Sequence, residues 1–183
     1  MVSDEAGLPL NYGFIRNRYV GRTFIMPEQS NRASGNDMKL SVARSVVQGK
    51  RVIVVDDSII RGTTAKRRIQ ALRDQGATEV HLRISCPPTK HPCFFGIDFP
   101  TSSELIAHNK SIPETAEWLG CDSLGYLTID GLLSCVEKPA NFCNACFSGD
   151  YPMPVNLSQS KESLENASGQ LNFSVLPEKT VTQ

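Results

Sequence analysis

The sequence lacks an excess of charge, a long apolar run and any internal repeat. It carries 19 basic and 19 acidic residues among 183, so no net field draws the whole chain toward nucleic acid or a membrane. No run of about 18 apolar residues occurs, which argues against a membrane-spanning helix. The first residues lack an apolar signal-peptide core, so we expect a non-exported, cytoplasmic protein. The length fits one domain with a sizeable core.

The most informative segment joins an apolar run to a helical pattern. Residues 52–55, Val-Ile-Val-Val, predict a buried parallel strand. Residues 56–64, Asp-Asp-Ser-Ile-Ile-Arg-Gly-Thr-Thr, follow it, and residues 65–72 predict a helix that ends at Gly76. The acidic pair therefore stands at the carboxyl end of a strand, where open α/β sheets bind ligands. The loop opens a helix whose free N–H groups can receive a phosphate.

The residue types in this loop suit a phosphorylated sugar. Asp56 and Asp57 can accept hydrogen bonds from two ribose hydroxyls, directly or through a divalent cation. Gly62 lets the backbone approach a phosphate closely, and the following two threonine hydroxyls add donors. Arg61 either adds a charge-assisted contact or faces solvent. The alternative interpretation is an N-capped βα turn, in which Asp and Ser are present because turns favour them.

Strand and helix patterns alternate along the rest of the chain. Strands are predicted at 14–15, 22–25, 80–85 and around 124–126. Helices are predicted over 39–48, after capping boxes at 101–104 and 111–114, and through an amphipathic stretch reaching Val136. This alternation predicts a parallel sheet covered on both faces.

A basic turn lies between the first two predicted strands. Arg16, Arg18 and Arg22, with Tyr19, are suited to closing over a phosphorylated sugar. A solvated basic edge is the alternative. The sequence alone leaves both interpretations open.

The six cysteines favour metal binding or buried thiols over disulfides in a non-exported α/β chain. Cys143 and Cys146 form a Cys-x-x-Cys pair, which places two thiolates on one tight turn, as zinc and iron–sulfur sites do. One pair is half a site, and Cys93 is the candidate third ligand. A zinc site completed by His91 and the absence of any metal are the alternatives. Ordinary buried thiols are expected at the remaining cysteines: Cys86, Cys121 and Cys135.

Residues 54–64 resemble the phosphoribosyl-pyrophosphate-binding signature of the type I phosphoribosyltransferases. The flanking segments resemble the glutamine-dependent amidotransferase branch of that family, which makes 5-phosphoribosylamine in the first step of de novo purine synthesis. These segments are 16–27, 92–98, 104–107, 122–127 and 141–149. The resemblance runs from about Gly7 to about Pro152.

The resemblance implies an α/β fold, a type I phosphoribosyltransferase-like parallel sheet with flanking helices that is incomplete at its N-terminus. It divides the chain into a partial phosphoribosyltransferase domain (1–136) and a Cys-x-x-Cys extension (137–155). The remaining residues, 156–183, are rich in Ser, Gln, Asn, Glu and Lys, and we expect this tail to be disordered.

In the mechanism that the resemblance implies, Mg²⁺ and the loops at the sheet edge hold phosphoribosyl pyrophosphate while ammonia attacks ribose C1. Asp56 and Asp57 would then bind the ribose and magnesium and stabilise the cationic sugar, with no covalent role. The 5′-phosphate would be held by the loop that follows: Ser58, Ile59, Ile60, Arg61, Gly62, Thr63 and Thr64. Arg18 and Tyr19 would belong to a loop that closes over the substrate.

The resemblance also places Cys93, Cys143 and Cys146 on three of the four cysteines that hold a [4Fe–4S] cluster in one branch of the family. The fourth has no counterpart here. The family's glutaminase domain also has no match, because residue 1 is Met and no cysteine precedes Cys86. The pyrophosphate-binding strand and loop are missing as well.

These differences predict the C-terminal part of a longer enzyme, whether a gene fragment, a truncated gene or one piece of a split protein. We expect it to be inactive alone and to have as partners the missing glutaminase domain or subunit and further copies of itself. The alternative is a non-catalytic remnant that binds a sugar phosphate, nucleotide or partner without turnover. A salvage phosphoribosyltransferase or a repressor is disfavoured, because neither explains the cysteine pair or the Arg-Asn-Arg-Tyr segment at 16–19.

Overall fold

The computed structural model describes residues 2–16, 40–97 and 101–155. The elements follow in the order α1 (Val2–Ala6), β1 (Phe14–Arg16), β2 (Leu40–Val42), α3 (Arg44–Val47), β3 (Arg51–Asp56), α4 (Thr63–Asp74), β4 (Glu79–Ile84), η2 (Ser102–Glu104), α5 (Ile106–Asn109), α6 (Ile112–Leu119), β5 (Ser123–Tyr126), α7 (Ile129–Leu133), η3 (Pro139–Asn141) and α8 (Ala145–Ser148). No helix among the described residues is long and apolar enough to cross a membrane.

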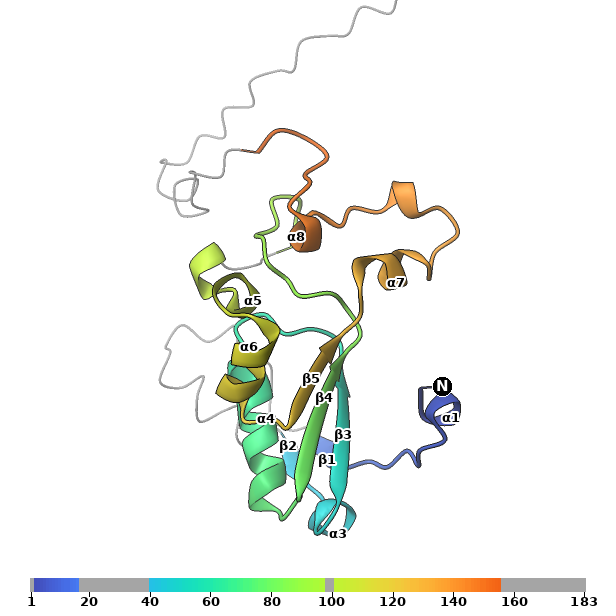
Figure 1. Ribbon diagram of the computed structural model, residues 1–183, viewed down its shortest axis with the longest axis vertical. Coiled ribbons are helices and arrows are strands. Elements are labelled where there is room, and N and C mark those ends of the chain that lie inside the picture. Colours follow the sequence, from blue (N-terminus) through green and yellow to red (C-terminus); the bar gives the residue numbers. More distant parts are fainter. Residues whose placement is uncertain (1, 17–39, 98–100, 156–183) are drawn as a thin grey trace, which may run out of the picture.

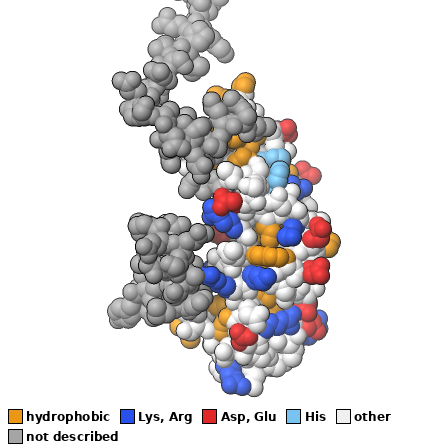
Figure 2. Space-filling view, turned by 90° about the vertical axis from the view of Figure 1, so that its left-hand side faces the viewer, with side chains coloured by type: hydrophobic (Ala, Val, Ile, Leu, Met, Phe, Trp, Pro, Cys, Tyr) orange, Lys and Arg blue, Asp and Glu red, His pale blue; other side chains and the backbone are white. Residues whose placement is uncertain are grey.

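The central sheet is parallel, with strand order β3-β4-β5, as the alternation of patterns predicts. Figure 1 shows α4, α5 and α6 gathered on one side of this sheet, and α7 and α8 beyond the carboxyl ends of its strands. A separate antiparallel pair is formed by β1 and β2, in which Phe14 lies opposite Val42. Figure 2 views the side that carries the helices, where basic and acidic side chains are interspersed.

The core lies between the helices and one face of the sheet. Alternate residues of β4 are buried on this face, namely Val80, Leu82 and Ile84. Ile69 and Leu72 of α4 pack in the same core, which Leu119 of α6 also joins. The helices bury these residues because their apolar positions recur on one face with the spacing of the α-helix. This packing fixes the positions of the loops at the carboxyl ends of β3 and β4.

The other face of the sheet is exposed, which corrects two predictions. On β3, Ile53 is 48% exposed and Val55 is 53% exposed, so the 52–55 run is not a fully buried strand. Nor is the sheet covered on both faces in the part of the chain that the structure describes. An unbroken aliphatic run is compatible with either arrangement, because it supplies apolar side chains to both faces of a strand.

The predicted helix over 39–48 is wrong in its first part and confirmed only in its last part. Its first part is strand β2, which pairs with β1, and only residues 44–47 form a helix before Gly49 (φ 70°) ends the turn. The pairing with β1 supplies a contact far away in the sequence that overrides the local helical pattern. The predicted strand at 14–15 is confirmed, whereas the one at 22–25 lies outside the described residues.

The two predicted capping boxes have different outcomes. At Ser111 the box is present, with the hydroxyl accepting from the Glu114 N–H and the Glu114 carboxylate accepting from the Ser111 N–H. At Thr101 it is absent, and a short 3₁₀ turn without a side-chain cap takes its place. Glu104, the expected capping acid, instead bonds to Arg61.

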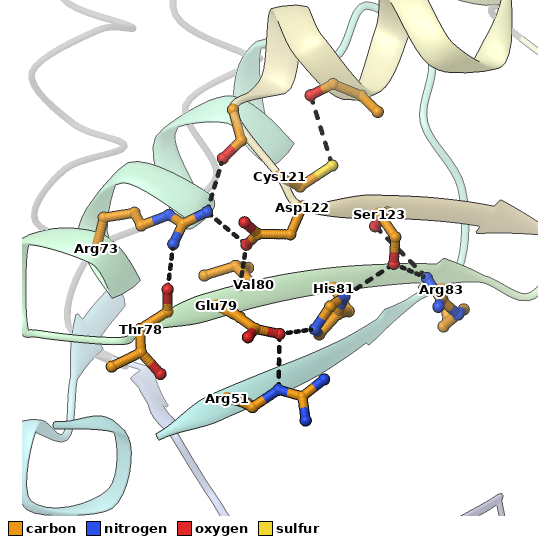
Figure 3. A network of polar contacts seen from close by, with 12 residues as sticks. Arg51, Arg73, Thr78, Glu79, Val80, His81, Arg83, Cys121, Asp122 and Ser123 are labelled. Atoms are coloured by element: carbon orange, nitrogen blue, oxygen red, sulfur yellow. Dashed lines mark hydrogen bonds and ion pairs between the residues drawn. The ribbon is translucent and has the colours of Figure 1, made fainter. Parts of the chain in front are cut away.

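The amino end of the sheet is held by a polar network (Figure 3). Arg73 of α4 donates to the Thr78 carbonyl at 2.9 Å and to the Asp122 carboxylate at 2.5 Å. The same carboxylate oxygen accepts from the Val80 N–H at 2.6 Å. Asp122 therefore joins the start of β5 to both α4 and β4, at the end of the sheet opposite the acidic loop.

Candidate phosphate-binding site

The loop between β3 and α4 encloses a cavity of about 320 Å³. Residues 56–65 and Arg68 line it. The cavity lies at the carboxyl end of β3, the end at which open α/β sheets bind ligands. The structure therefore brings residues 56–64, all proposed from the sequence as binding residues, around one hollow.

Gly62 is required in this loop for two reasons. Its φ of 79° is a left-handed conformation that side chains with a Cβ rarely adopt. A Cβ at this position would also lie 2.8 Å from a ring carbon of Trp118 and 2.9 Å from the Ile106 Cδ1. Trp118 and Ile106 thus pack against the loop at Gly62 and leave no room for a side chain there. The backbone of Ile60 is also fixed there, because its carbonyl accepts from the Ile106 N–H at 2.9 Å.

The start of α4 is open to a ligand. Gly62 is its N-cap residue, and no side chain of the described residues caps the helix there. This finding argues against the alternative of an N-capped turn, since that turn would place a side-chain oxygen on the first amides of the helix. Thr63 and Thr64 are exposed and belong to the same first turn as these amides. A phosphate oxygen could accept hydrogen bonds from the amides and from the threonine hydroxyls.

The two acids at the end of β3 differ in their surroundings. Asp56 is half-buried and pairs with the guanidinium of Arg68, one helical turn beyond the start of α4. Asp57 is exposed, and its Oδ1 accepts from the Ser58 N–H at 2.6 Å and from the Ser58 hydroxyl at 3.2 Å. Asp56 therefore carries an internal counter-charge, whereas Asp57 is held by neutral donors of the turn.

Arg68 is a member of the site that the sequence patterns do not reveal. It lines the cavity, and its Nε is buried without a hydrogen-bond partner in the described part of the chain. No local motif marks it, because the pair with Asp56 spans twelve residues and depends on how α4 packs against the sheet.

Arg61 does not simply face solvent. Its Nε donates to one Glu104 oxygen at 3.1 Å and a terminal nitrogen donates to the other at 3.3 Å. This two-point contact fixes the plane of the guanidinium at the rim of the cavity. Arg61 and Glu104 are both about half exposed, so the contact orients Arg61 more than it stabilises the fold. Arg18 and Tyr19, the other predicted binding residues, lie outside the described residues.

The predicted cysteine ligands lie in one neighbourhood. The Cys146 carbonyl accepts from the N–H groups of Lys90 and His91, both at 3.0 Å, which ties the turn of α8 to the loop that contains Cys93. Burial raises the pKa of the Cys146 thiol, and the nearby Cys93 and Cys143 raise it further. Nevertheless, no three His, Cys, Asp or Glu side chains among the described residues are grouped so that they could hold a metal ion.

The other cysteines follow the prediction in part. Cys86 and Cys121 are partly buried, and burial raises the pKa of Cys86 to about 11. Cys135 is exposed, so the prediction of a buried thiol there is wrong. It follows the short helix α7, where its thiol contacts the Gly131 carbonyl at 3.3 Å without being covered.

Comparisons with known proteins agree with this geometry. The phosphoribosyl transferase domain model matches residues 4–93. The amidophosphoribosyltransferase of Synechococcus elongatus is 52% identical over 166 residues, which are 89% of this chain and 34% of that protein. The Bacillus subtilis amidophosphoribosyltransferase is 49% identical over 158 residues, 84% of this chain and 33% of that protein. This chain thus spans about a third of the length of these relatives.

Solved structures give the same result. The glutamine phosphoribosylpyrophosphate amidotransferase of B. subtilis, complexed with ADP and GMP, superposes with a TM-score of 0.74 at 48% identity, covering 87% of this chain and 36% of that one. A structure described as the allosteric regulatory enzyme of purine biosynthesis gives a TM-score of 0.73 at 49% identity, covering 85% of this chain and 34% of that one.

Proposed function

Starting from the membership of this chain in the amidophosphoribosyltransferase family, we propose that it is the sugar-phosphate-binding part of such an enzyme. The ligand would be phosphoribosyl pyrophosphate. The single observation that carries the proposal is the cavity beneath Gly62, which the uncapped start of α4 and two carboxylates line together. The donors suit the 5′-phosphate, and the carboxylates suit the ribose hydroxyls.

The proposed reaction, in the complete enzyme, joins ammonia derived from glutamine to ribose C1. The C1–N bond forms as the C1–O bond to pyrophosphate breaks, and the nitrogen then loses a proton. Positive charge develops on the sugar, and carboxylates beside the ribose favour that charge. Asp56 and Asp57 would act in this way without forming a covalent bond. Arg18 and Tyr19 would close over the substrate.

Magnesium fits this site. Mg²⁺ usually binds through one or two carboxylates together with substrate phosphates. Asp57 offers an exposed carboxylate, while Arg68 engages only the Oδ2 of Asp56. When bound, the ion would neutralise charge on the phosphates. The residues of this chain would orient the sugar and hold its 5′-phosphate.

We do not extend the proposal to an iron–sulfur cluster or to zinc. Cys93, Cys143 and Cys146 lie in one neighbourhood, but the described side chains are not grouped as a metal site, and His91 does not complete one. His91 instead packs against Gly149, where a Cβ would meet its Nε2 at 3.1 Å. No step of the reaction is assigned to the cysteines.

The test is calorimetric titration of the purified protein with phosphoribosyl pyrophosphate in the presence of Mg²⁺. Replacing both acids, Asp56→Asn with Asp57→Asn, should weaken binding about tenfold or more, equivalent to at least about 1.4 kcal/mol. Asp74→Asn is the matched control, since it removes one exposed carboxylate at the far end of α4. Equal affinity in the double variant and in the control would contradict the proposal.

The alternative is a module that binds the sugar phosphate without turnover. This alternative concerns the chain taken alone, which spans about a third of the length of the amidophosphoribosyltransferases that it matches. We expect no glutamine-dependent formation of phosphoribosylamine from the purified chain, even where phosphoribosyl pyrophosphate binds. Turnover by the chain without added protein would show that it is catalytically sufficient.

A further inference from the structure

A second cavity, of about 420 Å³, opens at the same end of the sheet. One wall is the loop that follows β4, and another is the segment from α5 to the start of α6. Tyr126, the last residue of β5, also lines it. Figure 1 shows α5 beyond α6, toward the carboxyl ends of the strands. The cavity therefore occupies a position at which sheets of this type bind ligands, separate from the loop that follows β3.

The charged side chains that line this cavity are basic. Lys90, His108 and Lys110 line it, and none of the described residues that line it is acidic. Both lysines are exposed, so their ammonium groups can reach a ligand in the opening. Burial is the main cause that lowers the pKa of the neighbouring His91; His108 and Lys90 lower it further, whereas Asp150 raises it.

His108 is oriented in a way that suits this role. Its Nδ1–H donates to the Lys90 carbonyl at 2.9 Å, so Nε2 is the ring nitrogen left for a ligand, and it donates to an anion when the imidazole is protonated. The same bond joins α5 to the loop after β4, so two walls of the cavity are held together. This hydrogen bond therefore fixes the position of His108 relative to the backbone of Lys90.

Tyr126, which lines the cavity, carries an unsatisfied polar group. The Tyr126 hydroxyl is buried and has no hydrogen-bond partner within the described residues. Burial raises the pKa of Tyr126 to about 12, so the hydroxyl remains a neutral donor at ordinary pH. A buried hydroxyl without a partner is unfavourable, and a ligand oxygen that reached it would relieve that cost.

The start of α6 cannot supply the binding energy by itself. Its capping box is closed, because the Glu114 carboxylate already accepts from the Ser111 N–H at 2.7 Å and from the Ser111 hydroxyl at 2.6 Å. Side chains rather than helix amides must therefore hold an anion here. Pro88 and Ile112 add apolar surface to the lining, so a carbon skeleton can be accommodated beside the charged groups.

From the lining, the position and the unpartnered hydroxyl, we propose that this cavity is a second anion site, which binds a phosphate group carried by a small organic molecule. Lys90 and Lys110 would supply the charge, with His108 as a further contact. The site is distinct from the cavity under Gly62. The two share α5, because the Ile106 N–H binds the Ile60 carbonyl of the first site while the next three residues line the second.

The test uses inorganic phosphate as the probe and amide resonances of the ¹⁵N-labelled full chain as the readout. At constant ionic strength, adding phosphate should shift the amides of residues 107–112 saturably. The double variant Lys90→Gln with Lys110→Gln should weaken this response about tenfold or more. Lys50→Gln with Lys138→Gln removes the same charge from exposed positions outside both cavities and should leave the response unchanged.

The amides of residues 58–64 report on the first cavity in the same spectra. The phosphate-induced shifts of these amides should be unchanged in the Lys90 and Lys110 double variant. The two cavities are therefore tested independently in one experiment. Two results would overturn the second site: no saturable shift at 107–112, or a shift there that the double variant leaves intact.

Discussion

Arg68 forms an ion pair with Asp56 inside the cavity proposed to bind phosphoribosyl pyrophosphate. The aspartate stands at the end of β3 and the arginine in the second turn of α4, so the pair joins the strand to the helix across the loop. One of the two carboxylates expected to meet a ribose or a cation is therefore already paired. Arg68 sets how much negative charge the site offers before a ligand arrives.

Removing Arg68 should strengthen the binding of a divalent cation. In Arg68→Met the apolar stem is retained while the counter-charge on Asp56 is lost. The affinity for Mn²⁺, measured by electron paramagnetic resonance as a substitute for Mg²⁺, should rise about threefold to tenfold, since a partly exposed ion pair is worth about 1 kcal/mol. Arg67→Met is the control, because Arg67 is exposed and does not line the cavity. Identical Mn²⁺ affinities in the two variants would show that Arg68 does not limit the charge of the site.

Replacing Gly62 should damage both the fold and the site. Gly62→Ala must accommodate a Cβ at positive φ and against Trp118 and Ile106, and it should lower the free energy of unfolding by about 2–4 kcal/mol. Gly49→Ala has a similar φ of 70° but no atom within 4 Å of the new Cβ, so it should show the conformational cost alone. Chemical denaturation of the two variants measures the difference. Equal losses would mean that the contacts behind the loop contribute nothing.

These residues show what the sequence can and cannot predict. The strand, the loop and α4 are local patterns, so the amino-acid sequence suffices to propose residues 56–64 as a binding loop, and the structure places them around one cavity. Arg68 and Glu104 are not identifiable in this way, because each reaches its partner only after the helices have packed. The exposure of Ile53 escapes prediction for a related reason: burial on the second face of a strand depends on what the rest of the fold lays against it.

The sulfur-containing region illustrates the same limit. The Cys-x-x-Cys spacing is local and readily detected, and the fold does bring Cys93 near Cys143 and Cys146. Whether such thiols form a metal site depends on angles and on a further ligand that spacing does not encode. The described side chains do not adopt that grouping.

The stabilising contribution of Asp122 should be lost at low pH. The Val80 N–H and then the Arg73 guanidinium hold the pKa of Asp122 below its ordinary value of 3.8. A carboxyl with a lowered pKa in the folded state stabilises the fold fully above its unfolded pKa and loses that contribution as the pH falls through the folded value. The loss should therefore occur below about pH 4, and Asp122→Asn should remove this part of the pH dependence. Thermal unfolding between pH 2 and 6 measures it, with Asp74→Asn as a control that should keep the wild-type slope.

The exposed face of the sheet should tolerate polar substitution, whereas the helix-covered face should not. Ile53→Thr keeps a β-branched side chain at a position that is 48% exposed, so unfolding should become easier by no more than about 0.5 kcal/mol. Leu82→Ala, on the central strand, empties a site that is 2% exposed and should cost about 2–5 kcal/mol. Urea denaturation of the two variants compares the faces directly. A large loss of stability in Ile53→Thr would mean that this face is covered in solution, either by another segment of the chain or by a second copy. Only in the second case would the loss depend on protein concentration.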